Sequence, residues 1–244
     1  ADNGQFFMRI NATAETGAAL EDLRQGFAEV AKPFGMNYEF HDQSATMKVI
    51  IMVSSFGHCL HDLLYRVRIG ALPIYVVDST QDHMDYQKVV VNQDIPFQCI
   101  KVTKDNKPQA EARIMEVVEE TGAELIVLAR YMQILSSNFV SHYPHRVINI
   151  HHSFLPAFVG ANPYQQAHDK GVKLIGATSH YVTEDLDQGP IIEQNVQRVS
   201  HRHSAAELRS LGQDVERQVM LRAVRWHLED RVIVDGNKTV VFVK

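Results

Sequence analysis

Three side chains in the second half of this sequence can together move an acyl group: Asn149, His151 and Asp187. Asn149 and His151 lie two residues apart where an apolar run ends, so both fall on one face if that run is a β-strand. An amide can donate a hydrogen bond to a developing oxyanion, while an imidazole and a carboxylate handle protons and orient each other. The residue types therefore indicate acyl transfer or hydrolysis.

Metal chemistry is an alternative, because the chain contains 13 histidines. No HExxH motif occurs, and the adjacent pair His151 and His152 would diverge to opposite faces of a strand, which does not suit a shared ion. We expect no catalytic metal, and we expect His152 to support the loop without acting as a catalyst. The other candidate histidines fit surface, helix-start or hydrogen-bonded structural roles: His168, His180, His201 and His203.

The first strand-to-helix turn, residues 54–60, does not match two common nucleotide sites. It reads Ser-Ser-Phe-Gly-His-Cys-Leu. This wording has neither the second and third glycines of a dinucleotide fingerprint nor the Gly-Lys-Ser/Thr of a P-loop. Phe56 and His58 would also keep a phosphate away from the backbone amides. The turn therefore predicts another kind of ligand.

The elements that must position these residues alternate, from Lys48 onward, between short apolar runs and helix-like segments. Five runs are predicted as strands: 49–53, 74–77, 97–100, 125–128 and 147–150. This alternation is typical of a parallel sheet covered by helices on both faces, which binds its ligands at the carboxyl ends of the strands. Two later runs, 173–178 and 191–196, have no helix-length segment between them and predict a mixed sheet in the second half.

Three further patterns complete the expected domain. The spacing of apolar residues predicts a helix over 108–121. Ser204 followed by Glu207 is a capping-box signature that opens a long helix. The two apolar runs of 232–243 flank an Asp-Gly-Asn turn, which predicts a β-hairpin.

The composition limits the function class. The chain has 244 residues, 45% apolar and 22% charged, which is ordinary for one large or two unequal globular domains. Lys and Arg total 24 against 29 Asp and Glu, so we expect no nucleic-acid partner. No apolar run approaches the ~20 residues that span a bilayer, so no membrane association is expected. Two cysteines, Cys59 and Cys99, make no disulfide framework, which favours a cytoplasmic location.

The first 45 residues differ from the rest in their pattern of apolar and polar residues. Residues 5–12 and 37–41 suit strands, and the segment from Thr16 has a helical pattern. One helix and two strands bury too little apolar area to be stable alone, so we expect a small α+β unit completed by upstream residues or by another chain. The chain begins at Ala1 without Met, which also predicts residues upstream.

One long ordered pattern resembles a known family. Taken singly, His151 suits a core histidine and Asp187 a turn residue. Their joint occurrence reverses that interpretation. The pattern is Asn149-Ile150-His151, Ser153, Leu155-Pro156, Gly160 and Pro163, followed by Asp187-Gln188-Gly189-Pro190-Ile191-Ile192. It resembles the catalytic domains of folate-dependent formyltransferases. The sequences of residues 151–158 and 128–136 resemble those of the family members that hydrolyse 10-formyltetrahydrofolate to tetrahydrofolate and formate.

The resemblance implies a Rossmann-like α/β formyltransferase domain over 46–244 with a mostly parallel sheet. It also implies that residues 1–45 are part of an ACT-like α+β (ferredoxin-like) regulatory domain. In that fold the first strand lies between the last two, and this sequence lacks it. Residues 5–12 and 37–41 should therefore lack a shared ladder partner. An amino-acid effector at this segment and a homo-oligomeric state are implied by the same resemblance.

The resemblance assigns roles to individual residues. Asn149, His151 and Asp187 match the catalytic trio. The folate-binding loops match Met132, Gln133, Ile134, Leu135, Thr183 and Glu184, largely through backbone groups. The folate is the substrate, and neither a cofactor nor a metal is implied.

The acceptor of the formyl group is the remaining question. In glycinamide ribonucleotide formyltransferase, the phosphate of the amine substrate lies on a Gly-rich first turn. Phe56, Gly57, His58 and Cys59 occupy that turn here, which favours water as the acceptor. Hydrolysis would supply formate and free tetrahydrofolate to one-carbon and purine metabolism. Three alternatives stay open: formyl transfer to an amine, a folate- or amino-acid-sensing module without turnover, and a metallohydrolase.

Overall fold

The protein, as a computed structural model, divides into two compact units, Ala1–Thr46 and Met47–Lys244. The structure describes residues 4–13, 17–70, 74–81, 86–155 and 163–243. Among the helices in these ranges, none is both long enough and apolar enough to cross a membrane.

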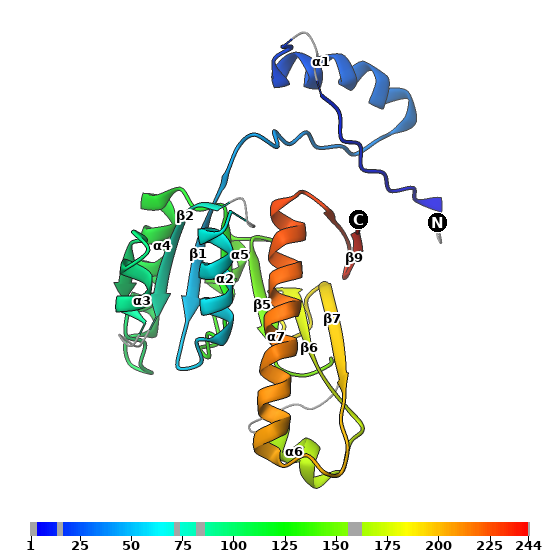
Figure 1. The fold of residues 1–244 in the computed structure, drawn as a ribbon. Helices are drawn as coiled ribbons and strands as arrows, with labels where there is room; N and C mark the ends of the chain where they lie inside the picture. Colours follow the sequence, from blue (N-terminus) through cyan, green and yellow to red (C-terminus); the bar gives the residue numbers. More distant parts are fainter. Residues whose placement is uncertain (1–3, 14–16, 71–73, 82–85, 156–162, 244) are drawn as a thin grey trace. The chain divides into compact units, whose positions relative to one another are not determined.

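A seven-stranded sheet with the order β3-β2-β1-β4-β5-β6-β7 forms the centre of the second unit (Figure 1). The strands are β1 (Met47–Val53), β2 (Ile74–Gln81), β3 (Phe97–Cys99), β4 (Leu125–Leu128), β5 (Val147–His151), β6 (Leu174–Tyr181) and β7 (Ile191–Arg198). The first five pair in parallel, whereas β6 and β7 are antiparallel to their neighbours. The predicted mostly parallel sheet with a mixed second half is confirmed.

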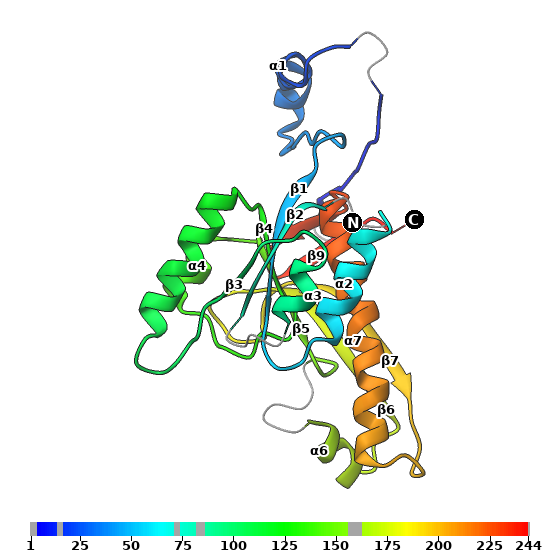
Figure 2. The same cartoon turned by 60° about the vertical axis from the view of Figure 1, so that its left-hand side comes forward.

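Helices cover both faces of this sheet, which explains why its central strands are apolar on both sides. The helices are α2 (His58–Arg68), α3 (Gln87–Val91), α4 (Lys107–Thr121), α5 (Ser137–His142), α6 (Pro163–Asp169) and α7 (Ala205–Leu228). Alternate residues of β1 point to opposite layers: Val49 and Ile51 pack with α2, α3 and α7, and Ile50 and Met52 pack with α4 and α5. Figure 2 shows α4 on the side of the sheet opposite to α2, α3 and α7.

The long helix α7 begins where the capping box was predicted. Ser204 N donates to Glu207 Oε2 at 2.7 Å, and Glu207 N donates to Ser204 Oγ at 3.3 Å. After α7, the hairpin of β8 (Val232–Asp235) and β9 (Lys238–Val241) turns at Gly236, whose φ is 59°. Both predictions are confirmed.

The strand order brings three loops to one edge of the sheet. β1 lies between β2 and β4, so the chain leaves β1 and β4 toward opposite sides, and a ligand crevice forms at such a switch point. The loops that follow β1, β4 and β5 begin at Ser54, Ala129 and His152. All three start at the carboxyl ends of parallel neighbours and therefore meet around His151.

The first unit contains α1 (Leu20–Ala31) and the 3₁₀ turn η2 (Lys32–Phe34). The Phe27, Tyr38 and Phe40 rings make edge-to-face contacts with centroids 4.9–5.9 Å apart. Residues 5–12 and 37–41 form no strand, so the strand prediction was wrong. A strand needs a neighbour to satisfy its backbone N–H and C=O groups, and neither segment has a ladder partner among the described residues. The ACT-like interpretation stays a prediction.

Candidate active site

Asn149 and His151 both lie on β5, and their side chains share one face of that strand. The strand alternates here between buried Ile148 and Ile150 and the half-buried Asn149 and His151. The structure therefore places the first two predicted catalytic residues side by side, as their spacing indicated.

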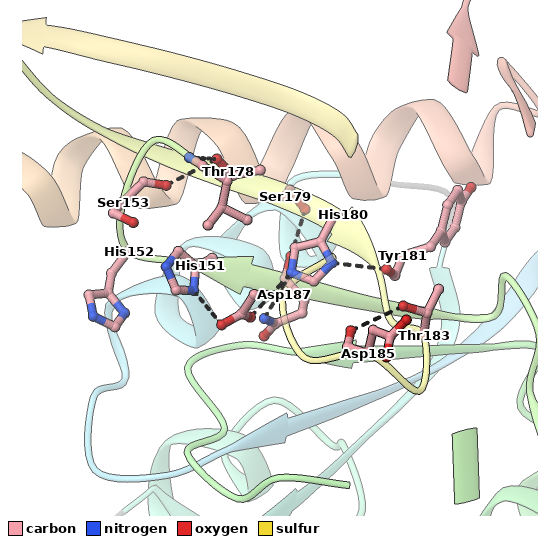
Figure 3. A network of polar contacts seen from close by, with 12 residues as sticks. His151, His152, Ser153, Thr178, Ser179, His180, Tyr181, Thr183, Asp185 and Asp187 are labelled. Atoms are coloured by element: carbon pink, nitrogen blue, oxygen red, sulfur yellow. Dashed lines mark hydrogen bonds and ion pairs between the residues drawn. The ribbon is translucent and has the colours of Figure 1, made fainter. Parts of the chain in front are cut away.

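Asp187 reaches His151 from the loop between β6 and β7. The His151 Nδ1 atom lies 3.2 Å from Asp187 Oδ2 (Figure 3). Asp187 itself has a φ of 55°, a left-handed conformation that costs about 1–2 kcal/mol outside glycine and often marks functional sites. The loop is fixed beside it, because Gly189 lies so close to Tyr181 that an added Cβ would be 1.8 Å from the carbonyl oxygen.

The contact with His151 sets the charge of the carboxyl group. The hydrogen bond from His151, followed by the nearby His180 ring with its Nε2 3.6 Å from Asp187 Oδ1, holds the Asp187 pKa well below its usual value, against the burial that would raise it. The ionised carboxylate accepts from His151 Nδ1, which leaves Nε2 of the neutral ring unprotonated. This Nε2 atom is buried and has no hydrogen-bond partner within the described part of the chain.

His180 is part of this site, although the sequence suggested a structural role at most. It is 2% exposed on β6, in the register that places it opposite Asn149. Its Nδ1 donates to the Tyr181 carbonyl at 2.9 Å, so its neutral Nε2 accepts from Asn149 Nδ2 at 3.3 Å. Within the described residues, His180 is the partner of the Asn149 amide nitrogen. Only the antiparallel register of β5 and β6, which no sequence pattern gave, points to His180.

A second polar cluster surrounds Glu216 of α7, which is 1% exposed. His58 Nε2 lies 2.8 Å from Glu216 Oε2, Tyr164 OH donates to Oε1 at 2.6 Å, and Arg130 Nε lies 3.4 Å from Oε2. Burial raises the Glu216 pKa, but the His58 hydrogen bond and the Arg130 charge bring it below the usual value. The buried charge is therefore paired, as a stable interior requires.

Part of the same cluster has ligand atoms within the spacing of a metal site. Those of His58, Cys59 and Glu216 lie within 4.8 Å of one another. Arg130 already provides positive charge beside Glu216, and burial raises the Cys59 pKa well above its usual value, so the sulfur stays a neutral thiol. This donor set fits an ion-pair cluster better than a divalent cation.

The His152 ring stacks on the His151 ring, so the expected divergence of the two side chains was wrong. Their centroids are 5.0 Å apart and the rings are inclined by 22° (Figure 3). β5 ends at His151, and the alternation of a strand therefore does not extend to His152. The Arg130 Nη1 atom lies 2.6 Å from His152 Nδ1, which links the stack to the Glu216 cluster.

The predicted folate-binding residues lie on two loops beside the trio. The segment 132–135 follows Arg130 after β4, with Met132 52% and Ile134 60% exposed. Met132 N donates to Ser54 Oγ at 3.1 Å, which ties this loop to the one after β1. Thr183 and Glu184 precede Asp187 on the β6–β7 loop, where Thr183 Oγ1 donates to the Asp185 carbonyl. Their role in binding stays a prediction.

The loop after β5 is partly described. Thr178 Oγ1 donates to the Ser153 carbonyl at 3.0 Å and accepts from Leu155 N at 3.1 Å, which orders the start of the loop. The later motif positions Pro156, Ala157, Phe158 and Gly160 lie outside the described residues. An oriented amide, an imidazole nitrogen without a partner in the described part of the chain, and an ionised carboxylate are thus assembled at one edge of the sheet. This arrangement can activate a nucleophile against an acyl group.

Comparison with known proteins finds similar sequences and the same fold elsewhere. Residues 47–224 match the family described as formyl transferase. A formyltetrahydrofolate deformylase from Bacillus subtilis (strain 168) is 48% identical over 242 residues, which is 99% of this chain and 81% of that protein. The crystal structure of formyltetrahydrofolate deformylase from Burkholderia mallei has a TM-score of 0.88 at 47% identity, covering 93% of this chain and 81% of that one. A glycinamide ribonucleotide transformylase from Symbiobacterium toebii has a TM-score of 0.75 at 27% identity, covering 86% and 99%.

Proposed function

This chain belongs to the formyl transferase family and, within it, to the formyltetrahydrofolate deformylases, and we propose that it hydrolyses 10-formyltetrahydrofolate to tetrahydrofolate and formate. The structural observation that best supports this proposal is the environment of the His151 ring. His151 has its Nδ1 on the Asp187 carboxylate, and its buried Nε2 is unpartnered within the described residues. That nitrogen is the group that can take a proton from water.

The reaction needs a nucleophile, an oxyanion partner and a proton for the leaving nitrogen. Water attacks the formyl carbon while His151 Nε2 takes one of its protons. The carbonyl oxygen becomes negative and accepts a hydrogen bond from the amide N–H of Asn149 that does not face His180. The C–N10 bond then breaks, and His151 returns its proton to N10, which leaves tetrahydrofolate and formic acid. The acid releases its remaining proton to solvent and becomes formate.

Asp187 supports this cycle as an orienting charge. Its pKa lies well below the usual value because of the His151 contact, so it is a weak proton acceptor near neutral pH. An ionised carboxylate on Nδ1 instead selects the reactive tautomer and stabilises the imidazolium that forms during attack. Water positioning by the second carboxylate oxygen is compatible with this role.

The first strand-to-helix turn supports water as the acceptor. His58 points inward to Glu216 at 2.8 Å, and Cys59 is 1% exposed. An added Cβ on Gly57 would be 2.4 Å from the Tyr86 ring, and Tyr86 OH donates to the Ser55 carbonyl. The side chains of this turn pack against other residues of the protein, and they leave little room there for a phosphorylated amine. Formyl transfer to an amine is the second candidate, because of the likeness to the transformylase fold.

Further proposals concern binding and assembly. Met132, Gln133, Ile134, Leu135, Thr183 and Glu184 bind the folate, and no cofactor is used. The first unit exposes large apolar side chains, including Phe6 at 80%, Ile10 at 70% and Phe34 at 72%, which is typical of an interaction surface. This exposure supports pairing of copies. The resemblance of residues 1–45 to an ACT domain is the ground for proposing an amino-acid effector there. A cytoplasmic location follows from the substrate and the low cysteine content.

The decisive experiment supplies the full chain with 10-formyltetrahydrofolate alone. Tetrahydrofolate is followed by absorbance, and formate is measured in parallel with a coupled assay. We expect the two products in equal amounts without any acceptor, and an unchanged rate in the presence of a chelator. Formate release that depends on an added amine, or binding of the folate without turnover, would replace hydrolysis by transfer or by sensing.

A further inference from the structure

We propose that His152 is a positioning residue for His151, and that Arg130 fixes it as a neutral ring stacked against the catalytic imidazole. This inference deepens the proposed function and rests on it for its kinetic consequences. The arrangement runs from His151 through His152 and Arg130 to the buried Glu216.

The protonation state of His152 follows from the chemistry of its partner. Arg130 Nη1 lies 2.6 Å from His152 Nδ1, and a guanidinium can only donate hydrogen bonds. Nδ1 must therefore accept, so the proton of this ring is on Nε2 and the ring is neutral. Burial and the nearby Arg130 charge lower the His152 pKa to about 4, in agreement with this assignment.

Arg130 is held in place by several independent contacts. Its φ of 63° is a left-handed conformation that non-glycine residues rarely adopt, and its backbone N donates to the Leu128 carbonyl at 3.0 Å. Its Nε lies 3.4 Å from Glu216, and its guanidinium carbon lies 5.3 Å from the Phe56 ring centroid. The side chain is therefore a fixed donor that aims at His152.

The stack supplies a restraint that Asp187 alone does not give. A single hydrogen bond to Nδ1 of His151 fixes one atom but allows the ring to rock about that contact. The His152 ring, 5.0 Å away and inclined by 22°, covers one face and limits this motion. The direction of the His151 Nε2 lone pair is then defined, which matters because small misplacements of reacting groups can cost about 10²-fold in rate.

The charge state of the stack is suited to the same task. The titratable and charged groups facing His152 are Arg130, His151, Glu216 and Asp187, with the Tyr164 ring 6.5 Å away between centroids. A neutral His152 lets His151 accept a proton without a second imidazolium at its face. A proton relay through His152 is not compatible with this assignment, because Arg130 occupies its Nδ1.

The kinetic test compares His152→Ala, His152→Phe and the matched control His142→Phe. His142 is an exposed histidine at the end of α5, which precedes the start of β5 and thus lies away from His151. We expect His152→Ala to lower kcat about 10- to 100-fold with KM within about twofold. His152→Phe keeps a flat ring and should recover most of kcat with the same pH profile, and His142→Phe should match the wild type. Loss of one limb of the pH profile in His152→Phe would overturn the proposal.

A double-mutant cycle separates positioning from a general structural effect. In the His151→Ala background, adding His152→Ala should lower the residual formate release by less than about twofold, because the ring that His152 positions is gone. A full additional loss would show that His152 acts elsewhere and would overturn the proposal.

An NMR experiment tests the assignment of His152 independently of the proposed hydrolysis. Long-range ¹H–¹⁵N correlation spectra of histidine-labelled protein, assigned with His152→Phe, report the tautomer without turnover. We expect a neutral Nε2–H ring for His152 at pH 6. An Nδ1–H tautomer or an imidazolium at that pH would overturn the assignment even in an active enzyme. If His152 has the predicted tautomer but the protein releases no formate, the proposed function is wrong and the assignment of His152 stands.

Discussion

The Asp187 carboxylate lies 3.2 Å from Nδ1 of His151, and this contact decides which imidazole nitrogen faces the reacting atoms. An ionised oxygen can only accept, so the neutral ring must hold its proton on Nδ1 and present Nε2 as a base. The same contact joins the last residue of β5 to a residue of the β6–β7 loop. Its removal should therefore affect chemistry more than folding.

Asp187→Asn tests this relationship with almost no change in shape. The new amide can present an N–H to Nδ1 and select the opposite tautomer, which removes the base from the site. We expect kcat for formate release to fall by roughly 10²- to 10⁴-fold. A variant that keeps more than a tenth of the wild-type kcat would contradict the orienting role.

Asn149→Ala removes the amide that His180 orients through a 3.3 Å contact. Deletion of one oxyanion donor typically costs about 10²- to 10³-fold in kcat, because the bond strengthens as charge develops. Steady-state kinetics should show this loss mainly in kcat. A change confined to KM would assign Asn149 to ground-state binding.

Gly189→Ala tests the geometry of the loop that carries Asp187. The added Cβ would be 1.8 Å from the Tyr181 carbonyl oxygen, and a rigid backbone atom can move away only if the loop shifts. We expect kcat to fall by roughly 10²-fold or more through displacement of Asp187. Gly26→Ala on α1, where an added Cβ would meet nothing within 4 Å and φ is not in the left-handed region, is the matched control and should retain the wild-type kcat.

The half-buried His152 predicts a pH dependence of stability. Its pKa falls from the usual 6.5 to about 4 on folding, so the unfolded chain binds more protons between these values. The contribution of the neutral His152 ring to the free energy of unfolding is fully present above pH 6.5, and it is lost as the pH falls toward 4. Between pH 7 and pH 5 the wild type should lose about 2 kcal/mol of unfolding free energy through this group. Urea titrations should show a smaller loss for His152→Phe, and equal losses in the two proteins would be evidence against a neutral His152 ring.

Glu216→Leu tests the pairing of the buried cluster. The substitution leaves Arg130 without its carboxylate, and removal of one partner of a buried ion pair typically costs about 3–5 kcal/mol. Chemical denaturation should detect this loss. Glu216→Gln keeps the shape and part of the hydrogen bonding, so a smaller loss is expected. Equal losses for the two variants would assign the effect to packing instead of charge.

Much of the fold could be predicted from local sequence patterns. Apolar runs such as 49–53 and 125–128 predicted buried parallel strands, and Ser204 with Glu207 predicted the start of α7, because both signals arise from neighbouring residues. The strand prediction for residues 5–12 was wrong for the complementary reason. Alternation shows that a segment can be a strand, while the ladder that makes it one depends on a partner elsewhere.

The chemistry of Asn149, His151 and Asp187 could be inferred from the chain alone, since their types, order and spacing are local facts. The contacts that hold these side chains in place form only in the folded protein. The register of β5 and β6 places His180 against Asn149, and the left-handed Arg130 brings its guanidinium to His152. These contacts join residues distant in the chain. They depend on where strands end and how loops return, which hydrophobic periodicity does not specify.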